Sequence, residues 1–249
     1  MLDRFKRCFA GTVIAWLWHR FAPSLVVRKR FHGASIFMNL RDNIDDASRT
    51  TRELENREGV VLSVAGAVSG GVWDVGANVG LFTVRATLLG RRCIAFELSP
   101  RACRLLQRTR HYNGLSFEIV DRPLDVETRS YEPPTSAGPE NAVIADPDGA
   151  KQTLTFREAC GTYGVPALIK MDIEGGEAAF FANAEFKTWI CENTIFWLVE
   201  VHTGKLGFTP EWQDVPHVTL TNDGGHYLYC SDEGELTALC RSLDLPVPS

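Results

Sequence analysis

Hydrophobic runs of strand length alternate with helical patterns through most of the chain. The runs lie at residues 71–75, 93–97, 116–121, 167–173 and 194–202, and the helical patterns at 81–89, 101–113, 155–163 and 177–186. Strands and helices that alternate in this way form parallel sheets with helices on both faces. Two further apolar runs, 217–220 and 226–230, flank Asn222-Asp223-Gly224-Gly225, a strong hairpin signal. We therefore predict an α/β protein with a doubly wound, Rossmann-like sheet of about seven strands that ends in a C-terminal antiparallel hairpin.

The first 45 residues are predicted to form an N-terminal appendage, an amphipathic helix and short strands, in front of a main domain at 46–249. An apolar run at 8–18 lies between basic residues and is too short to span a bilayer, which takes roughly 20 apolar residues. As a helix it fits an interfacial membrane helix, but it fits packing on its own domain or on a partner subunit at least as well. We favour packing.

Two strands are expected between residues 24 and 40, around a basic turn that contains Arg28, Lys29 and Arg30. Such a basic run is most often a solvated turn, although an anionic substrate group could use it. A helix is predicted to begin at Asp45 and to run toward Val68.

Residues 122–151 interrupt the alternation of strands and helices. The segment is rich in Pro, Gly, Asp and Glu, and a loop of this length in a compact domain is usually functional or disordered. It is our candidate for a lid that faces the substrate, and a mobile excursion without a role is the alternative.

Composition narrows the class of protein. The 249 residues are 45% apolar and 23% charged, as in an ordinary soluble domain, and the net charge of -5 argues against a general nucleic-acid binder. The seven cysteines show no C-x-x-C pair and no zinc spacing, so we expect reduced thiols and a cytoplasmic protein.

The stretch from Gly71 to Val84, GVWDVGANVGLFTV, reads as a strand, a glycine-rich turn and a helix. A dinucleotide fingerprint needs a glycine where Asn78 stands, and Gly80 comes one residue early, so the turn is a poor cradle for a pyrophosphate. Asp74 would repel phosphate but could accept hydrogen bonds from an amino group. Glu97 follows Gly76 at about the distance of an acid that binds ribose hydroxyls.

This combination suits S-adenosylmethionine, which carries an ammonium group and a free ribose but no phosphate. The alternative is a strand-to-helix turn that holds no ligand. The predicted cofactor residues are Asp74, Gly76, Ala77, Asn78, Gly80, Glu97 and Asp121, the last at the end of the third expected strand.

A second group of polar side chains lies at the ends of the two later buried strands. Lys170 and Asp172 share one side of their strand, as do Glu200 and His202. Methyl transfer is an in-line displacement that needs alignment of the acceptor, and an alcohol acceptor also needs a base. Asp172, His202, Glu200 and Lys170 are therefore the predicted catalytic residues.

Each of these residues also has a structural interpretation. Glu200 could pair with Lys170 or another cation, and His202 could be a loop-edge histidine with a satisfied hydrogen bond. Glu177 is interpreted as a helix N-terminal acid that interacts with the dipole. Asp172 and Glu174 could hold a divalent metal with a third oxygen ligand. We expect no metal, because the sequence places no third acid there.

The segments VWDVGANVGLFT, AFELSP, LIKMDIEGGE and LVEVH resemble the FkbM-type S-adenosylmethionine-dependent methyltransferases, over residues 71–202. One departure is Glu97-Leu98-Ser99-Pro100, where Glu-Pro is usual. The resemblance implies a class I methyltransferase fold and O-methylation of a hydroxyl on a sugar, glycan or polyketide-like metabolite. It also matches Lys170, Asp172, Glu174 and Glu177 to the family's second signature.

The leading hypothesis is therefore a SAM-dependent O-methyltransferase that acts on a small molecule or glycan and not on nucleic acid. The alternative is a non-catalytic SAM-binding or scaffold subunit that docks a partner through its N-terminal helix. A nucleotide-dependent oxidoreductase is disfavoured by Asn78. Peripheral membrane contact through residues 1–21 and a homo-oligomer are further options.

Overall fold

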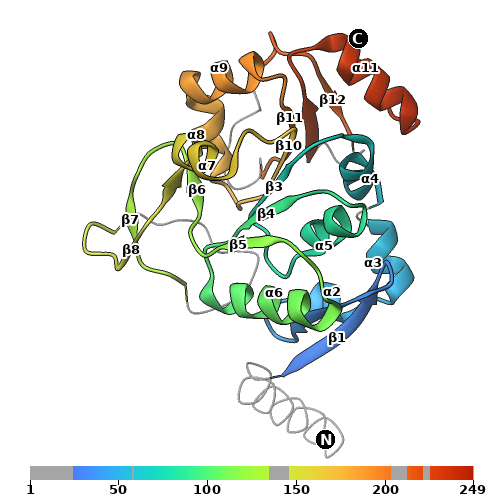
Figure 1. Cartoon of the computed structure of the whole chain (residues 1–249), viewed down its shortest axis with the longest axis vertical. Coiled ribbons are helices and arrows are strands. Elements are labelled where there is room, and N and C mark those ends of the chain that lie inside the picture. Colours follow the sequence, from blue (N-terminus) through green and yellow to red (C-terminus); the bar gives the residue numbers. More distant parts are fainter. Residues whose placement is uncertain (1–24, 58, 135–145, 203–211, 221–224, 249) are drawn as a thin grey trace, which may run out of the picture.

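The computed structural model describes residues 25–57, 59–134, 146–202, 212–220 and 225–248 (Figure 1). Its centre is a seven-stranded sheet in the order β12-β13-β11-β10-β3-β4-β5. The five parallel strands are β3 (Val72–Val75), β4 (Cys93–Phe96), β5 (Glu118–Val120), β10 (Leu168–Met171) and β11 (Phe196–Glu200).

The C-terminal edge of this sheet is antiparallel. β13 (His226–Tyr229) pairs antiparallel with β11, and β12 (His217–Thr219) pairs antiparallel with β13. The predicted doubly wound, Rossmann-like sheet of about seven strands with a C-terminal antiparallel pair is thus confirmed. The turn at 221–224 lies outside the described residues.

Helices cover both faces of the sheet because the apolar side chains of each strand alternate between two hydrophobic clusters. Val72 of β3 and Leu198 of β11 belong to the first cluster. Their neighbours Trp73 and Trp197 belong to the second. The first cluster packs under α4 (Gly59–Ala67), α5 (Leu81–Leu88), α6 (Pro100–Asn113) and α11 (Glu233–Ser242). The second packs under α7 (Phe156–Tyr163), α8 (Glu177–Ala182) and α9 (Ala184–Glu192).

The sheet order reverses between β3 and β10. β3 pairs in parallel with β4 on one side and with β10 on the other. The strands that follow β3 in the chain, β4 and β5, lie on the first side, and the later strands β10 and β11 lie on the second. A crevice at the carboxyl ends of the strands is expected there, and it is the usual ligand site of open α/β sheets.

The N-terminal strands form a hairpin apart from the main sheet. β1 (Val26–Phe31) pairs antiparallel with β2 (Ala34–Asn39), followed by α2 (Ile44–Ser48) and α3 (Thr51–Arg57). Phe31, Ile36 and Met38 belong to the same hydrophobic cluster as Val72 of the sheet. The proposed boundary at residue 45 stays a prediction, and the predicted helix at 8–18 lies outside the described residues.

Two helices differ from the sequence prediction. The stretch expected as one helix from 45 to 68 forms α2, α3 and α4. The helix expected at 177–186 ends at Ala182, and α9 begins after Asn183, whose side chain accepts a hydrogen bond of 2.7 Å from the Phe186 amide. The N-terminal cap at Asn183 thus starts a new helix where the apolar pattern continues.

The segment 122–151 is partly regular. β6 (Leu124–Asp125) pairs in parallel with β9 (Leu154–Thr155), and β7 (Ser130–Tyr131) pairs antiparallel with β8 (Lys151–Gln152). Buried Asp125 accepts two hydrogen bonds, of 2.7 and 2.8 Å, from the Arg129 guanidinium. The flanks of the predicted lid are therefore anchored, while residues 135–145 lie outside the described part of the chain.

The six described cysteines are free, in agreement with the expectation of reduced thiols. Within the described ranges, the helices are too short or too polar to cross a bilayer.

Candidate functional site

The turn between β3 and α5 lies tightly against the end of β10. Gly76 has a φ of 80°, and a Cβ atom there would lie 1.9 Å from the backbone oxygen of Asp172. Gly80 has a φ of 89°, and its Cβ would lie 2.2 Å from the Leu106 side chain. Asn78 also has a positive φ, 48°, which asparagine tolerates better than most residues. The two glycines are therefore required by the close approach of the turn to its neighbours.

Glu97 braces this turn from β4. Its carboxylate accepts hydrogen bonds of 2.7 Å from the amides of Asn78 and Ser99, while the amide of Ala77 donates to the carbonyl of Phe96. Burial raises the pKa of Glu97, and the two amide donors oppose that rise because they stabilise the charged form. A carboxylate offers about four lone-pair sites, so Glu97 can still accept a hydrogen bond from a hydroxyl group.

Asp74 is fully buried at the centre of the site. Its Oδ2 accepts hydrogen bonds from the amide (3.0 Å) and the hydroxyl (2.5 Å) of Thr83. Its Oδ1 has no hydrogen-bond donor among the described residues and lies 3.7 Å from Lys170 Nζ. The same Nζ lies 3.4 Å from Asp172 Oδ2, so Lys170 joins the turn to the end of β10.

Asp121 lies farther from the turn than the other predicted cofactor residues. It follows β5, its side chain is largely exposed, and it forms a 2.7 Å ion pair with Lys151 next to β7. The structure thus places Asp121 one strand outward from the other predicted cofactor residues. It brings the remaining six of the seven together at the ends of β3 and β4: Asp74, Gly76, Ala77, Asn78, Gly80 and Glu97.

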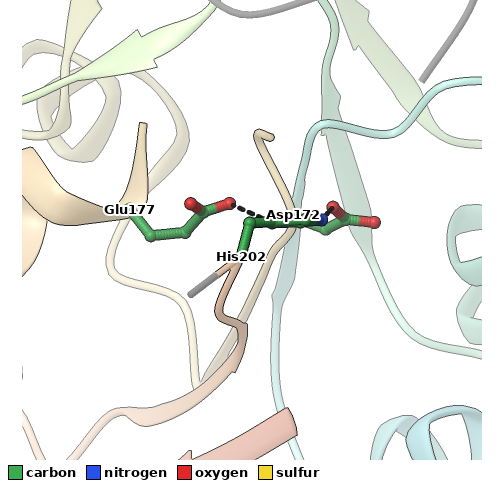
Figure 2. Close-up of side chains that lie close together, drawn as sticks. All are labelled: Asp172, Glu177 and His202. Atoms are coloured by element: carbon green, nitrogen blue, oxygen red, sulfur yellow. Dashed lines mark ion pairs between the residues drawn. The ribbon is translucent and has the colours of Figure 1, made fainter. Parts of the chain in front are cut away.

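A cluster of acidic groups surrounds His202 at the ends of β10 and β11. The imidazole lies between two carboxylates, with Nδ1 3.3 Å from Glu177 Oε1 and Nε2 3.8 Å from Asp172 Oδ1 (Figure 2). Glu174 Oε2 and Glu200 Oε1 lie 3.6 and 4.0 Å from the same Nε2. His202 therefore lies at a loop edge just after β11, as the structural interpretation supposed, but four carboxylates surround it.

Glu177 lies in the first turn of α8, as the helix N-terminal interpretation requires, and it has a further role. It is fully buried, and its two carboxylate oxygens each accept a 2.8 Å hydrogen bond, from the amides of Ile173 and Gly175. The side chain folds back over the turn at 173–176 and holds the His202 ring. The interpretation as a simple helix N-terminal acid misses this contact, because nothing local in the sequence places His202 beside it.

Glu200 pairs with a histidine that sequence reasoning did not single out. His226 Nε2 lies 3.2 Å from Glu200 Oε2, and the two residues face each other across β11 and β13. The hairpin signal predicted β13, but only the strand register places His226 opposite Glu200. The structural interpretation of Glu200 as one member of an ion pair is supported, with His226 as the close partner.

These contacts set the charges of the cluster at neutral pH. The Glu177 carboxylate raises the pKa of His202 to about 9, and Asp172 and Glu174 add to the rise. Burial raises the pKa of Asp172 to about 6, although Lys170 and His202 oppose it. Burial would also raise the pKa of Glu200, but the contact with His226 outweighs it and lowers that pKa. His202 is therefore an imidazolium at pH 7, and Asp172 is a carboxylate that can take up a proton.

The same groups could hold a divalent cation, since ligand atoms of Asp172, Glu177 and His202 lie within 4.8 Å of one another. Glu177 is the third acid that the sequence did not place. However, the two ring nitrogens face different carboxylates, whereas metal ligands converge on one point (Figure 2). This arrangement favours an imidazolium that bridges two carboxylates.

Comparison with known proteins gives only distant structural similarity. No protein-family model matches the chain, and no curated protein matches it. A tRNA (uracil-54, C5)-methyltransferase of Pyrococcus abyssi, solved with S-adenosyl-L-homocysteine, aligns at 10% identity and a TM-score of 0.43, over 82% of this chain and 43% of its own.

Two other structures align in a similar way. Trm5 of Methanocaldococcus jannaschii, solved with adenosine, aligns at 12% identity and a TM-score of 0.43, over 82% of this chain and 53% of its own. The 16S rRNA N2 G1207 methyltransferase RsmC of Thermus thermophilus, solved with AdoMet and guanosine, aligns at 13% identity and a TM-score of 0.42, over 83% and 50%. This chain thus spans about half or less of their lengths. Similarity this distant assigns neither a reaction nor an acceptor to this chain.

Proposed function

We propose that this protein is an S-adenosylmethionine-dependent methyltransferase that methylates a hydroxyl of a sugar, glycan or polyketide-like small molecule. The observation that carries the proposal is the contact between the glycine turn and the end of β10, where Gly76 lies directly against Asp172. The turn that would hold the cofactor thus lies against the end of β10, where Asp172 also carries a carboxylate that can accept a proton. Methyl transfer to an alcohol needs this proximity of donor, acceptor and base.

The turn has the features that the cofactor requires. Asp74 Oδ1, buried and without a hydrogen-bond donor among the described residues, supplies an acceptor for the ammonium group. Glu97, fixed by two backbone amides, supplies acceptors for the ribose hydroxyls. Asn78 stands where the dinucleotide fingerprint has its second glycine, which disfavours a pyrophosphate and with it a nicotinamide dinucleotide.

The roles at the acceptor side follow from the charges. Asp172, with a pKa raised to about 6, takes the proton of the acceptor hydroxyl as the new bond forms. His202, with a pKa raised to about 9, stays protonated and is a positioning residue, held by buried Glu177. Lys170 and Glu200 orient the cluster through Asp172 and His226. The chain thus supplies one base and several groups that hold it.

The acidic surroundings also bear on the acceptor. Asp172, Glu174, Glu177 and Glu200 all lie within 4.0 Å of His202. Such a site repels phosphate groups and accommodates a neutral or cationic molecule. This supports a small molecule or glycan in preference to a nucleic acid.

The proposal is tested by transfer of a labelled methyl group from S-adenosylmethionine to a panel of glycans, hydroxylated small molecules and RNA. We expect labelling of a hydroxylated small molecule or glycan, and its loss in Asp172→Asn with cofactor binding retained. Labelling of RNA alone would overturn the proposed acceptor. Cofactor binding without turnover on any acceptor would favour the alternative, a SAM-binding scaffold subunit.

A further inference from the structure

A cationic surface lies on the opposite side of α6 from the hydrophobic core, although the whole chain carries a net charge of -5. The hairpin β1-β2 packs beside α6 (Figure 1), where the amide of Phe37 donates a hydrogen bond to the Thr109 hydroxyl. The Asn113 side chain accepts a hydrogen bond from the Ser35 amide and donates one to the Ser35 carbonyl. β1, β2 and α6 contain no acidic residue. Positive and negative charges are therefore distributed unevenly over the molecule.

Two rows of side chains make up this surface. Val26, Arg28 and Arg30 alternate along the exposed side of β1. Arg104, Arg108 and Tyr112 follow one another at four-residue spacing along α6 and are exposed. We name these six residues the β1/α6 face. Arg104 and Arg30 have no acidic partner among the residues that the structure describes.

Aromatic contacts hold the cations of the face in place. The Arg108 guanidinium lies 4.1 Å from the centroid of the Phe37 ring. The Arg28 guanidinium donates a hydrogen bond to the Tyr112 hydroxyl and lies 5.4 Å from the centroid of that ring. Because these guanidinium groups are already positioned, binding of an anion costs less side-chain entropy. The face is a preformed site for an anionic surface.

Its apolar members point to the kind of partner. Tyr112 is 54% exposed and Val26 39% exposed, and Leu25, which directly precedes β1 and lies outside the six residues of the face, is 47% exposed. Arginines interspersed with tyrosine and aliphatic side chains are typical of the boundary between lipid headgroups and acyl chains. The sequence that leads into β1 carries Arg4, Lys6 and Arg7 before its apolar run, a pattern of the same character.

We infer that the β1/α6 face docks on a membrane that contains anionic phospholipids. A nucleic acid offers the same negative charge, but it has no use for the exposed Leu25 and Val26. This docking is independent of the proposed methyl transfer.

The test is co-sedimentation of the full chain with vesicles of phosphatidylcholine, alone or with one third phosphatidylserine. We expect binding to the anionic vesicles only, weakened by added salt. A basic residue near an anionic membrane contributes roughly a factor of five in affinity, so loss of two such residues costs ~30-fold, and the charge reversals in Arg104→Glu/Arg108→Glu should weaken binding by at least that factor. The matched control, Arg157→Glu/Arg241→Glu, changes the net charge equally on other helices, α7 and α11, and should bind like the parent.

Each outcome decides the inference. Equal binding to neutral vesicles, equal loss in both double variants, or no binding to either vesicle would overturn it. RNA binding in a mobility-shift assay that is lost in Arg104→Glu/Arg108→Glu, without vesicle binding, would assign the face to a nucleic acid instead. Thermal unfolding of the variants, measured in parallel, shows that they are folded without reference to S-adenosylmethionine binding, which keeps this inference separate from the proposed function.

Discussion

At the scale of single residues, the site depends on a few contacts that the backbone imposes. Gly76 shows this best, because both its positive φ and its contact with the Asp172 carbonyl exclude a side chain. Gly90 has nearly the same φ, 78°, but a Cβ atom there would meet nothing within 4 Å. Substitution of Gly90 therefore tests the cost of a left-handed backbone alone, and substitution of Gly76 adds the cost of a steric clash with Asp172.

We predict that Gly90→Ala lowers the free energy of unfolding by ~1 kcal/mol, the cost of a left-handed alanine. Gly76→Ala should lower it by at least ~2 kcal/mol more, because the turn must move away from β10. Cofactor affinity should fall in Gly76→Ala alone. Urea unfolding and calorimetric titration measure the two quantities. Equal effects of the two substitutions would show that the close approach of the turn to Asp172 is wrong.

The cluster around His202 predicts the pH dependence of turnover. Asp172 accepts a proton only when ionised, so kcat should rise as the pH increases through about 6, the raised pKa of Asp172. It should fall above about 9, where the His202 imidazolium is lost. Glu177→Gln removes the charge that raises the pKa of His202, so the alkaline limb should move to lower pH. An alkaline limb that stays in place would contradict the role assigned to Glu177.

The imidazolium bridge also predicts that turnover needs no divalent cation. Ligand atoms of Asp172, Glu177 and His202 lie within 4.8 Å of one another, but the two nitrogen atoms of His202 face Glu177 and Asp172 separately, which favours the imidazolium over a metal ion. Treatment with EDTA followed by gel filtration should therefore leave the rate of methyl transfer unchanged. Loss of activity that Mn²⁺ or Mg²⁺ restores would replace the bridge with a metal site.

At the scale of elements, the sequence predicts what depends on local pattern and fails where elements meet. The strands, the glycine turn and the C-terminal hairpin follow from apolar periodicity and turn residues. The positions of Glu177 and His226 depend on which strands pair and in what register, and no local signal contains that information. The small pairs β6-β9 and β7-β8 escape prediction because two-residue strands have no periodicity.

The break between α8 and α9 is an element-scale feature that one residue controls. Asn183 Oδ1 accepts a hydrogen bond from the Phe186 amide at the start of α9. We predict that Asn183→Ala costs ~1 kcal/mol in the free energy of unfolding, as the loss of an N-terminal cap does. Asn183→Asp keeps the acceptor and should cost much less. A chemical denaturation series compares the three proteins, and equal stability of all three would refute the cap.

At the scale of the whole molecule, the two poles of the charge distribution have separate tasks. The acidic cluster lies at the carboxyl ends of β10 and β11, and the cationic β1/α6 face lies on the N-terminal hairpin and α6. The net charge of -5 hides this division, so composition alone predicts no attraction to anionic surfaces. Only the packing of β2 on α6 brings the two basic segments together.

Binding of the cofactor is the property on which all the catalytic proposals depend. Calorimetric titration of the purified protein with S-adenosylmethionine and S-adenosylhomocysteine, beside Glu97→Ala, measures it most directly. We expect micromolar binding of both ligands, and its loss in Glu97→Ala, whose fold is checked by thermal unfolding, because Glu97 braces Asn78 and is the proposed acceptor for the ribose hydroxyls. Absence of binding to the folded parent protein would contradict the methyltransferase proposal itself. Equal binding by Glu97→Ala would show that the cofactor site is not at this turn.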